Sequence, residues 1–188
     1  MFMFDIETLG IESTTVILSM ACIHFNPEEK PTFQQLIDSA FFVKLDAKDQ
    51  VNRLGRTVSK STLEWWAGQH AAVKKKSFDP SPTDVKAEDA VELLNNWAKQ
   101  FPEWKKSTIW ARGSLDQMAY GSLENRLGVE PIFHFARWRD VRTAVDIFTG
   151  STNGYCKVVH PEFENYLVVK HDPIHDCALD VMMLVYGK

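Results

Sequence analysis

The sequence predicts an α/β fold in which a mixed five-stranded sheet is flanked by helices. Three β-rich stretches come first, at residues 2–10, 13–25 and 33–45, and connections of hairpin length join them, which favours antiparallel pairing. Further along, helical patterns alternate with two short strand patterns at residues 108–114 and 133–138. A run of strands followed by alternating helices and strands indicates a sheet with helices packed against it.

The composition supports one globular domain over residues 1–188. Hydrophobic residues make up 45% of the chain and aromatic residues 12%, which is too apolar for a disordered protein. No basic segment leads into an apolar run long enough for a signal peptide or a membrane span. The three cysteines are scattered, show no zinc-ligand spacing and suit reduced thiols, so we expect a cytoplasmic protein without membrane partners.

The first strand carries the most informative pattern. Asp5 and Glu7 are two residues apart, so a strand would project both carboxylates from the same face. Two ionised carboxylates at this distance repel each other unless a cation lies between them. Mg²⁺ and similar hard ions bind such oxygen ligands. A lone pair of this kind is more often the solvated side of an edge strand, so the metal hypothesis needs support from other parts of the chain.

Apolar periodicity and end signals predict five helices, at residues 61–67, 84–100, 117–127, 140–148 and 173–186. Ser61, with Glu64 three residues later, forms a capping-box pattern at the start of the first helix. Pro173 fits the first turn of the last one. The polar and basic residues 46–60 are expected to form a loop.

Two further acidic positions stand at the ends of predicted elements. Asp116 follows the strand at residues 108–114, and Asp180 lies on the last helix, five residues after His175. Five residues make nearly one and a half helical turns, so His175 would have to reach a shared site from the start of the helix. The net charge of −4 suits an enzyme that holds one strand end through metal ions better than a protein that wraps nucleic acid.

In this order, the motifs resemble a known family. The segments Phe4-Asp-Ile-Glu-Thr8, Ser114-Leu-Asp116 and His175-Asp-Cys-Ala-Leu-Asp180 match the three motifs of the DEDDh (DnaQ-like, ribonuclease T) 3′–5′ exonuclease superfamily. The match covers nearly the whole chain. Ser61–Trp66 and Arg139–Thr143 are also similar to phage exonucleases of the T-even type and to related bacterial 3′–5′ exoribonucleases. The resemblance implies a ribonuclease-H-like fold. It also implies that the protein acts in the cytoplasm of a bacterium or of a phage-infected host cell.

The resemblance also implies catalytic roles. Two divalent ions, Mg²⁺ or Mn²⁺, about 4 Å apart would catalyse phosphodiester hydrolysis. Their expected ligands are Asp5, Glu7, Asp116 and Asp180. His175 would take the proton from the attacking water, since an imidazole with a pKa of about 6.5 is available as a base near neutral pH. The expected products are nucleoside 5′-monophosphates.

The third motif contains an ambiguity, because His171 and Asp176 have the same spacing as His175 and Asp180. We choose His175 and Asp180, since the residues around them continue the helix as the family motif does. His171 precedes Pro173 and is expected outside the helix, as a surface or substrate-contacting residue. Asp176 would simply favour the positive end of the helix dipole.

Five residues are expected to bind the substrate: Thr8, Leu9, Trp65, Trp66 and Arg112. Thr8 and Leu9 follow the first motif and would contact the terminal nucleotide. Trp65 and Trp66 point about 100° apart on a helix, so one belongs in the core while the other can stack on a base. Arg112 is suited to phosphate, although a surface ion pair explains a single arginine equally well.

The leading hypothesis is therefore a metal-dependent 3′–5′ exonuclease acting at the 3′ end of a single strand or overhang. DNA is favoured over RNA, and a 3′–5′ exoribonuclease of the same fold remains the alternative. An inactive nucleic-acid-binding subunit and a phosphatase for small phosphoesters are further hypotheses, and the presence of all five catalytic residue types argues against the inactive subunit. The oligomeric state stays open, with a homodimer as one option.

Overall fold

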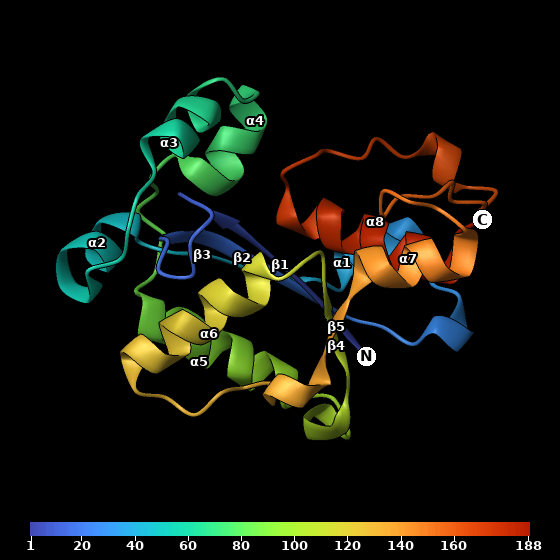
Figure 1. Cartoon of the computed structure of the whole chain (residues 1–188), viewed down its shortest axis with the longest axis horizontal. Helices are drawn as coiled ribbons and strands as arrows, with labels where there is room; N and C mark the ends of the chain where they lie inside the picture. Colours follow the sequence, from blue (N-terminus) through green and yellow to red (C-terminus); the bar gives the residue numbers. More distant parts are fainter.

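The computed structural model describes residues 1–188, and a five-stranded sheet runs through its centre (Figure 1). The strand order is β3-β2-β1-β4-β5, so the first strand occupies the middle of the sheet. The strands are β1 (Phe2–Thr8), β2 (Ile17–His24), β3 (Phe41–Lys44), β4 (Ile109–Ala111) and β5 (Trp138–Asp140). The α-helices are α1 (Phe33–Asp38), α2 (Ala47–Leu54), α3 (Lys60–Ala67), α4 (Ala71–Val73), α5 (Ala87–Ala98), α6 (Leu115–Leu127), α7 (Val141–Thr149) and α8 (Pro173–Tyr186). None of them is both long enough and apolar enough to cross a membrane.

The pairing confirms the predicted mixed sheet. β1 pairs antiparallel with β2, and β2 pairs antiparallel with β3. β4 lies parallel to β1, and β5 lies parallel to β4. Parallel neighbours need a crossover connection, which the helices after β3 and β4 provide.

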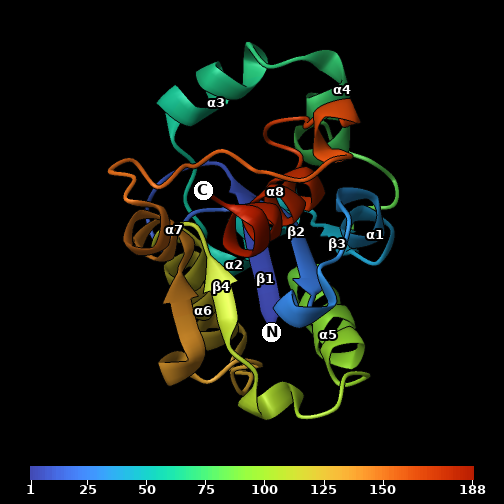
Figure 2. The same ribbon diagram turned by 90° about the vertical axis from the view of Figure 1, so that its right-hand side faces the viewer.

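Side chains alternate along β1 between two helical layers. Phe2, Phe4 and Ile6 pack in the core beneath α5 and α6. Met3 points the other way and packs with residues of α8, including Cys177 and Val181. Figure 2 shows α8 lying over β1 and β2, between α7 on one side and α1 on the other. The remaining odd-numbered side chains of β1 therefore face the start of α8.

The third predicted strand is shorter than expected. Its first part folds as α1, because Thr32 and Gln35 complete a capping box: each side chain accepts a hydrogen bond from the other residue's backbone N–H. Only Phe41–Lys44 joins the sheet. The last strand is also displaced, to residues 138–140 instead of 133–138, and it pairs with β4 over just three residues.

The predicted loop at residues 46–60 contains a helix. Asp46 caps α2 by accepting a hydrogen bond from the Asp49 N–H at 2.8 Å, and Gly55 ends it in the left-handed conformation. The helix that follows, α3, starts at Lys60, one residue earlier than expected, and its cap lies two residues earlier. Its cap is Ser59, whose hydroxyl accepts from the Thr62 N–H, and not Ser61.

Candidate active site

Asp5 and Glu7 place two carboxylates on the central strand. Both belong to the face of β1 that looks toward α8, and both are partly buried. Neither carboxylate forms an ion pair with a cationic side chain of the chain. The strand thus holds two partly buried acidic groups side by side, as its sequence predicts.

Asp116 reaches the same place from the first turn of α6. The parallel neighbour β4 pairs with β1 only at Phe2 and Met3, so the backbone of β1 beyond them lacks a strand on that side. Asp116 takes that position: its Oδ1 accepts a hydrogen bond from the Ile6 N–H at 3.1 Å, and its side chain is 6% exposed. A buried backbone donor needs such a partner.

The start of α8 supplies the remaining groups. Asp176 and Asp180 are four residues apart on this helix, so they lie on one face. His171 precedes the helix and has a left-handed backbone with φ of 63°. Its N–H donates to Asp176 Oδ2 at 2.9 Å, which fixes the loop against the helix.

These residues line one cavity of about 460 Å³. Its acidic lining consists of Asp5, Glu7, Asp116, Asp176 and Asp180. Its basic lining consists of Arg112, Arg142, Lys170 and His171. The convergence of Asp5, Glu7, Asp116 and Asp180, predicted from distant parts of the sequence, is therefore present in the structure.

His175 does not belong to this cavity. Its Nδ1 accepts a hydrogen bond from the Val169 N–H at 3.1 Å, and its ring packs edge-on against Phe33 of α1 at 5.6 Å between centroids. Consecutive helical residues point about 100° apart. Since Asp176 faces the carboxylates, His175 is turned away from them. The expectation that His175 reaches the site from the helix start is wrong, and His171 is the histidine that lines the cavity.

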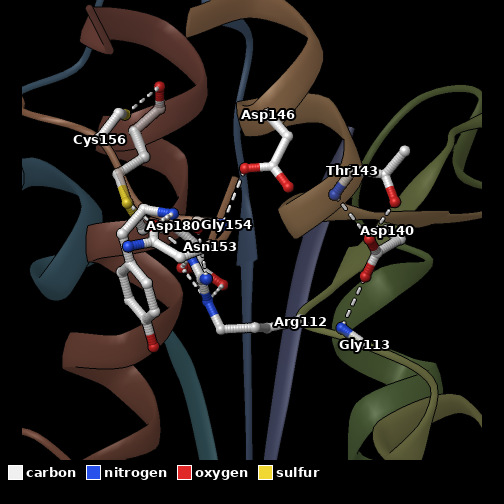
Figure 3. A network of polar contacts seen from close by, with 11 residues as sticks. Arg112, Gly113, Asp140, Thr143, Asp146, Asn153, Gly154, Cys156 and Asp180 are labelled. Atoms are coloured by element: carbon white, nitrogen blue, oxygen red, sulfur yellow. Dashed lines mark hydrogen bonds and ion pairs between the residues drawn. The ribbon is translucent and has the colours of Figure 1, made fainter. Parts of the chain in front are cut away.

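Asp180 and Arg112 form an ion pair at one side of the cavity (Figure 3). Arg112 Nε and Nη2 donate to Asp180 Oδ1 at 2.9 and 2.6 Å, and Nη1 donates to the Gly154 carbonyl at 2.7 Å. The Tyr155 ring covers the guanidinium, with 4.3 Å between the ring centroid and Cζ. Arg112 is thus engaged with the protein itself, in contrast to the phosphate contact that the sequence suggested, and Asp180 already has a cation.

The other carboxylates destabilise the folded protein when they are ionised, and a bound metal ion would remove this destabilisation. Burial, followed by repulsion from Asp116, Glu7 and the acids of α8, raises the pKa of Asp5 well above its ordinary value. Burial raises the pKa of Asp116 and that of Asp176 to about 7. Ligand atoms of Glu7, His171 and Asp176 all lie within 4.8 Å of one another. Closely spaced, buried oxygen donors without a cationic partner fit a hard divalent ion.

His171 has the properties of a base. Burial lowers the pKa of His171 from its ordinary value, so the imidazole is neutral near pH 7. The ring also meets Trp65 edge-on, with 4.7 Å between centroids. His171 therefore connects the acidic cavity to the tryptophan beside it.

A second cavity, of about 300 Å³, adjoins the first and shares Glu7 and Leu115 with it. Thr8 and Trp65 contribute to its wall, and Trp65 is 42% exposed. Trp66 is fully buried and donates from Nε1 to the Thr8 carbonyl at 3.0 Å. One tryptophan thus lies in the core and the other is free, as predicted.

Leu9 lies outside both cavities. Its side chain is 6% exposed and packs with Trp66, Val16 and Leu18 in a small apolar cluster. The fold therefore places Leu9 in the core beside Trp66 and not where the predicted contact with the terminal nucleotide could form.

The chain is similar to known nucleases. Residues 1–186 match the family described as the Rv2179c-like 3′–5′ exoribonuclease domain. An exodeoxyribonuclease of Enterobacteria phage T4 is 32% identical over 206 residues, which cover 99% of this chain and 88% of that protein. The nuclease domain of 3′hExo, a DEDDh family member whose structure contains bound rAMP, superposes with a TM-score of 0.61 at 14% identity. The superposition covers 97% of this chain and 90% of that one, and it confirms the ribonuclease-H-like fold.

Proposed function

Since this chain belongs to the family of Rv2179c-like 3′–5′ exoribonuclease domains and is a 3′–5′ exonuclease by that membership, we propose how its cavity works and which substrate it takes. The observation that carries the proposal is the single cavity lined by five carboxylates and a histidine at the end of the central strand. Asp5, Glu7, Asp116 and Asp176 would hold two divalent ions. When bound, the ions would activate the attacking water and stabilise charge on the leaving oxygen.

The side chains of the chain divide the remaining work. His171 accepts the proton of the water, because it is neutral near pH 7 and lies beside Glu7 and Asp176. Asp176 holds the His171 backbone and so sets the position of the ring. Asp180 neutralises Arg112, which in turn donates to the Gly154 carbonyl, and Asp180 takes no direct part in hydrolysis.

The adjoining cavity receives the terminal nucleoside. Its base stacks on the exposed face of Trp65, and the hydroxyls of Ser61 and Thr62 are available to the sugar. A 3′-phosphate would bring extra negative charge next to Glu7, which belongs to both cavities, so a free 3′ hydroxyl is required.

We favour DNA as the substrate. The relative that matches 99% of the chain is an exodeoxyribonuclease, whereas the family as a whole is named for an exoribonuclease. RNA is therefore the alternative, and the same cavity can hydrolyse either, since phosphodiester chemistry at the 3′ end is common to both.

A gel assay tests the proposal. Single-stranded DNA and RNA of one sequence, labelled at the 5′ end, are incubated with Mg²⁺, with Mn²⁺ or with chelator. A labelled ladder that shortens stepwise and needs the metal is expected, with a higher kcat/KM on DNA. The released 5′-mononucleotides carry no label and are identified by chromatography. A 3′-phosphorylated strand and a closed circle are the controls. Rapid cutting of the circle would refute the exonuclease geometry, and a higher kcat/KM on RNA would refute the substrate preference alone.

A further inference from the structure

A cavity of about 300 Å³ lies away from the acidic site, between the β1–β2 loop, the end of α2 and the middle of α6. Its lining consists of Thr14, Leu54, Gly55, Arg56, Ser122 and Arg126. Two arginines and two hydroxyls face this space, and the lining contains no carboxylate. A hollow with this composition is positively charged and rich in hydrogen-bond donors.

Arg56 is the buried centre of this cavity. The residue is 5% exposed and forms no ion pair. Its Nε donates to the Thr15 carbonyl at 2.7 Å, and its Nη2 donates to the carbonyls of Ser13 and Ala119 at 3.3 and 3.1 Å. No acceptor of the chain serves Nη1. Burial lowers the pKa of Arg56 to about 10, and no carboxylate opposes that change. A buried cation without a counter-charge is costly, so a bound anion would stabilise it.

Arg126 adds a second guanidinium from α6. Its Nε donates to the Leu54 carbonyl at 2.7 Å, which anchors the side chain to the end of α2. Its two terminal nitrogens have no acceptor in the chain and form no ion pair. Gly55, with φ of 66°, forms part of the wall; a Cβ at this position would lie 3.9 Å from Arg126 Nη2. The free donors of both arginines therefore border the same space.

The geometry points to a phosphate-binding subsite at this cavity, formed by Arg56, Arg126 and the hydroxyls of Thr14 and Ser122. Planar guanidinium groups bind phosphate oxygens through paired, charge-assisted hydrogen bonds. Serine and threonine hydroxyls can complete the set. The chemistry alone fits either a phosphodiester of the substrate strand or a free phosphate group.

The place of the cavity favours the strand. Ser122 and Arg126 follow Asp116 on the same helix by six and ten residues, which corresponds to about 9 and 15 Å along the axis. A nucleic acid held at its 3′ end in the acidic cavity could place a phosphate from further along its backbone in this subsite. This assignment of the source rests on the proposed nuclease function, whereas phosphate binding itself does not.

Binding without turnover separates the two sources. Wild type, Arg126→Gln and the control Arg137→Gln are compared in chelator, which prevents hydrolysis by removing the metal ions. Arg137 is exposed and has no hydrogen bond or ion pair of its side chain, so the control removes the same charge elsewhere. Fluorescence anisotropy measures binding of a single-stranded dinucleotide and of a longer oligonucleotide over a range of salt. Thermal unfolding with added inorganic phosphate measures binding of the free anion.

For a strand phosphate, Arg126→Gln weakens binding of the longer oligonucleotide about 10-fold and leaves the dinucleotide unchanged. The slope of log K against log salt, which is negative, then decreases in magnitude by about 0.7. For a free phosphate, only the stabilisation by inorganic phosphate is lost. If Arg126→Gln equals Arg137→Gln in both measurements, no phosphate subsite exists here.

Ser122→Asp tests the same idea without removing an arginine. It places a carboxylate in the lining, where it can pair with the guanidinium groups. The melting temperature without phosphate should rise, and the response to added phosphate should disappear. A lower melting temperature together with an unchanged response to phosphate would overturn the proposal.

Discussion

Replacing Asp116 by asparagine should stabilise the protein when no metal is present. Burial raises the pKa of this carboxyl from 3.8 to about 7. Each tenfold change in proton affinity corresponds to about 1.4 kcal/mol, so keeping the group ionised at pH 8 costs the fold about 4 kcal/mol. The amide carries no charge, and its oxygen can still accept the hydrogen bond from Ile6.

The sign of the effect depends on pH. Below about pH 4 the side chain is protonated in both the folded and the unfolded chain, so the cost is absent. It grows as the pH rises from about 4 to 7 and is constant above that range. For a chain of 188 residues, about 4 kcal/mol corresponds to a difference in melting temperature of about 8–16 °C.

Circular dichroism melting of wild type and Asp116→Asn in chelator, from pH 4 to pH 8, measures this. The two curves should meet at the acidic end and diverge toward pH 8, with the variant more stable. Saturating Mn²⁺ should raise the melting temperature of the wild type more than that of the variant, since the ion binds only the folded site. Equal melting temperatures in chelator at pH 8 would refute the reasoning that the buried negative charge of Asp116 destabilises the folded protein.

Three further substitutions separate the roles of neighbouring residues. His171→Ala should lower the single-turnover rate by about 10²–10⁴-fold and remove its rise with pH, whereas His175→Ala should keep both; the opposite pattern would make His175 the base. Trp65→Ala should weaken substrate binding by about 1–3 kcal/mol, seen as a higher KM with an unchanged melting temperature, and an unchanged KM would exclude stacking. Arg112→Gln should lower the free energy of unfolding by about 3–5 kcal/mol in urea, because it leaves Asp180 buried without its partner; weaker substrate binding at full stability would instead assign Arg112 to phosphate.

The sequence predicts much of the sheet and most of the acidic cavity, because both depend on local patterns. The spacing of Asp5 and Glu7 determines which way they point once a strand forms, and Asp116 follows a strand pattern directly. The helices α1 and α2 were missed for different reasons. The capping box at Thr32 is present in the sequence but is followed by an apolar stretch typical of a strand, while α2 is short and largely polar.

The choice between two histidines failed for a geometric reason. The prediction places the base on the helix, whereas His171 lies just before it. Its backbone is left-handed there, and no residue pattern in the sequence indicates that conformation. One signal was available. Asp176 and Asp180 are four residues apart and must share a helical face, which turns His175 away from both. The pairing of Asp180 with Arg112 joins residues 68 positions apart, and no local pattern reveals it.

The short length of β4 gives the protein a built-in probe of its own chemistry. Because the strand stops early, the Ile6 amide proton is held by Asp116 and not by a neighbouring backbone. Any event that changes that carboxylate, whether protonation or arrival of a cation, must alter the electron density around this one proton. The Ile6 amide resonance in an NMR spectrum should therefore report the state of the site directly, without any attached label. The exchange of this proton with solvent should become faster whenever its hydrogen bond to the Asp116 carboxylate breaks.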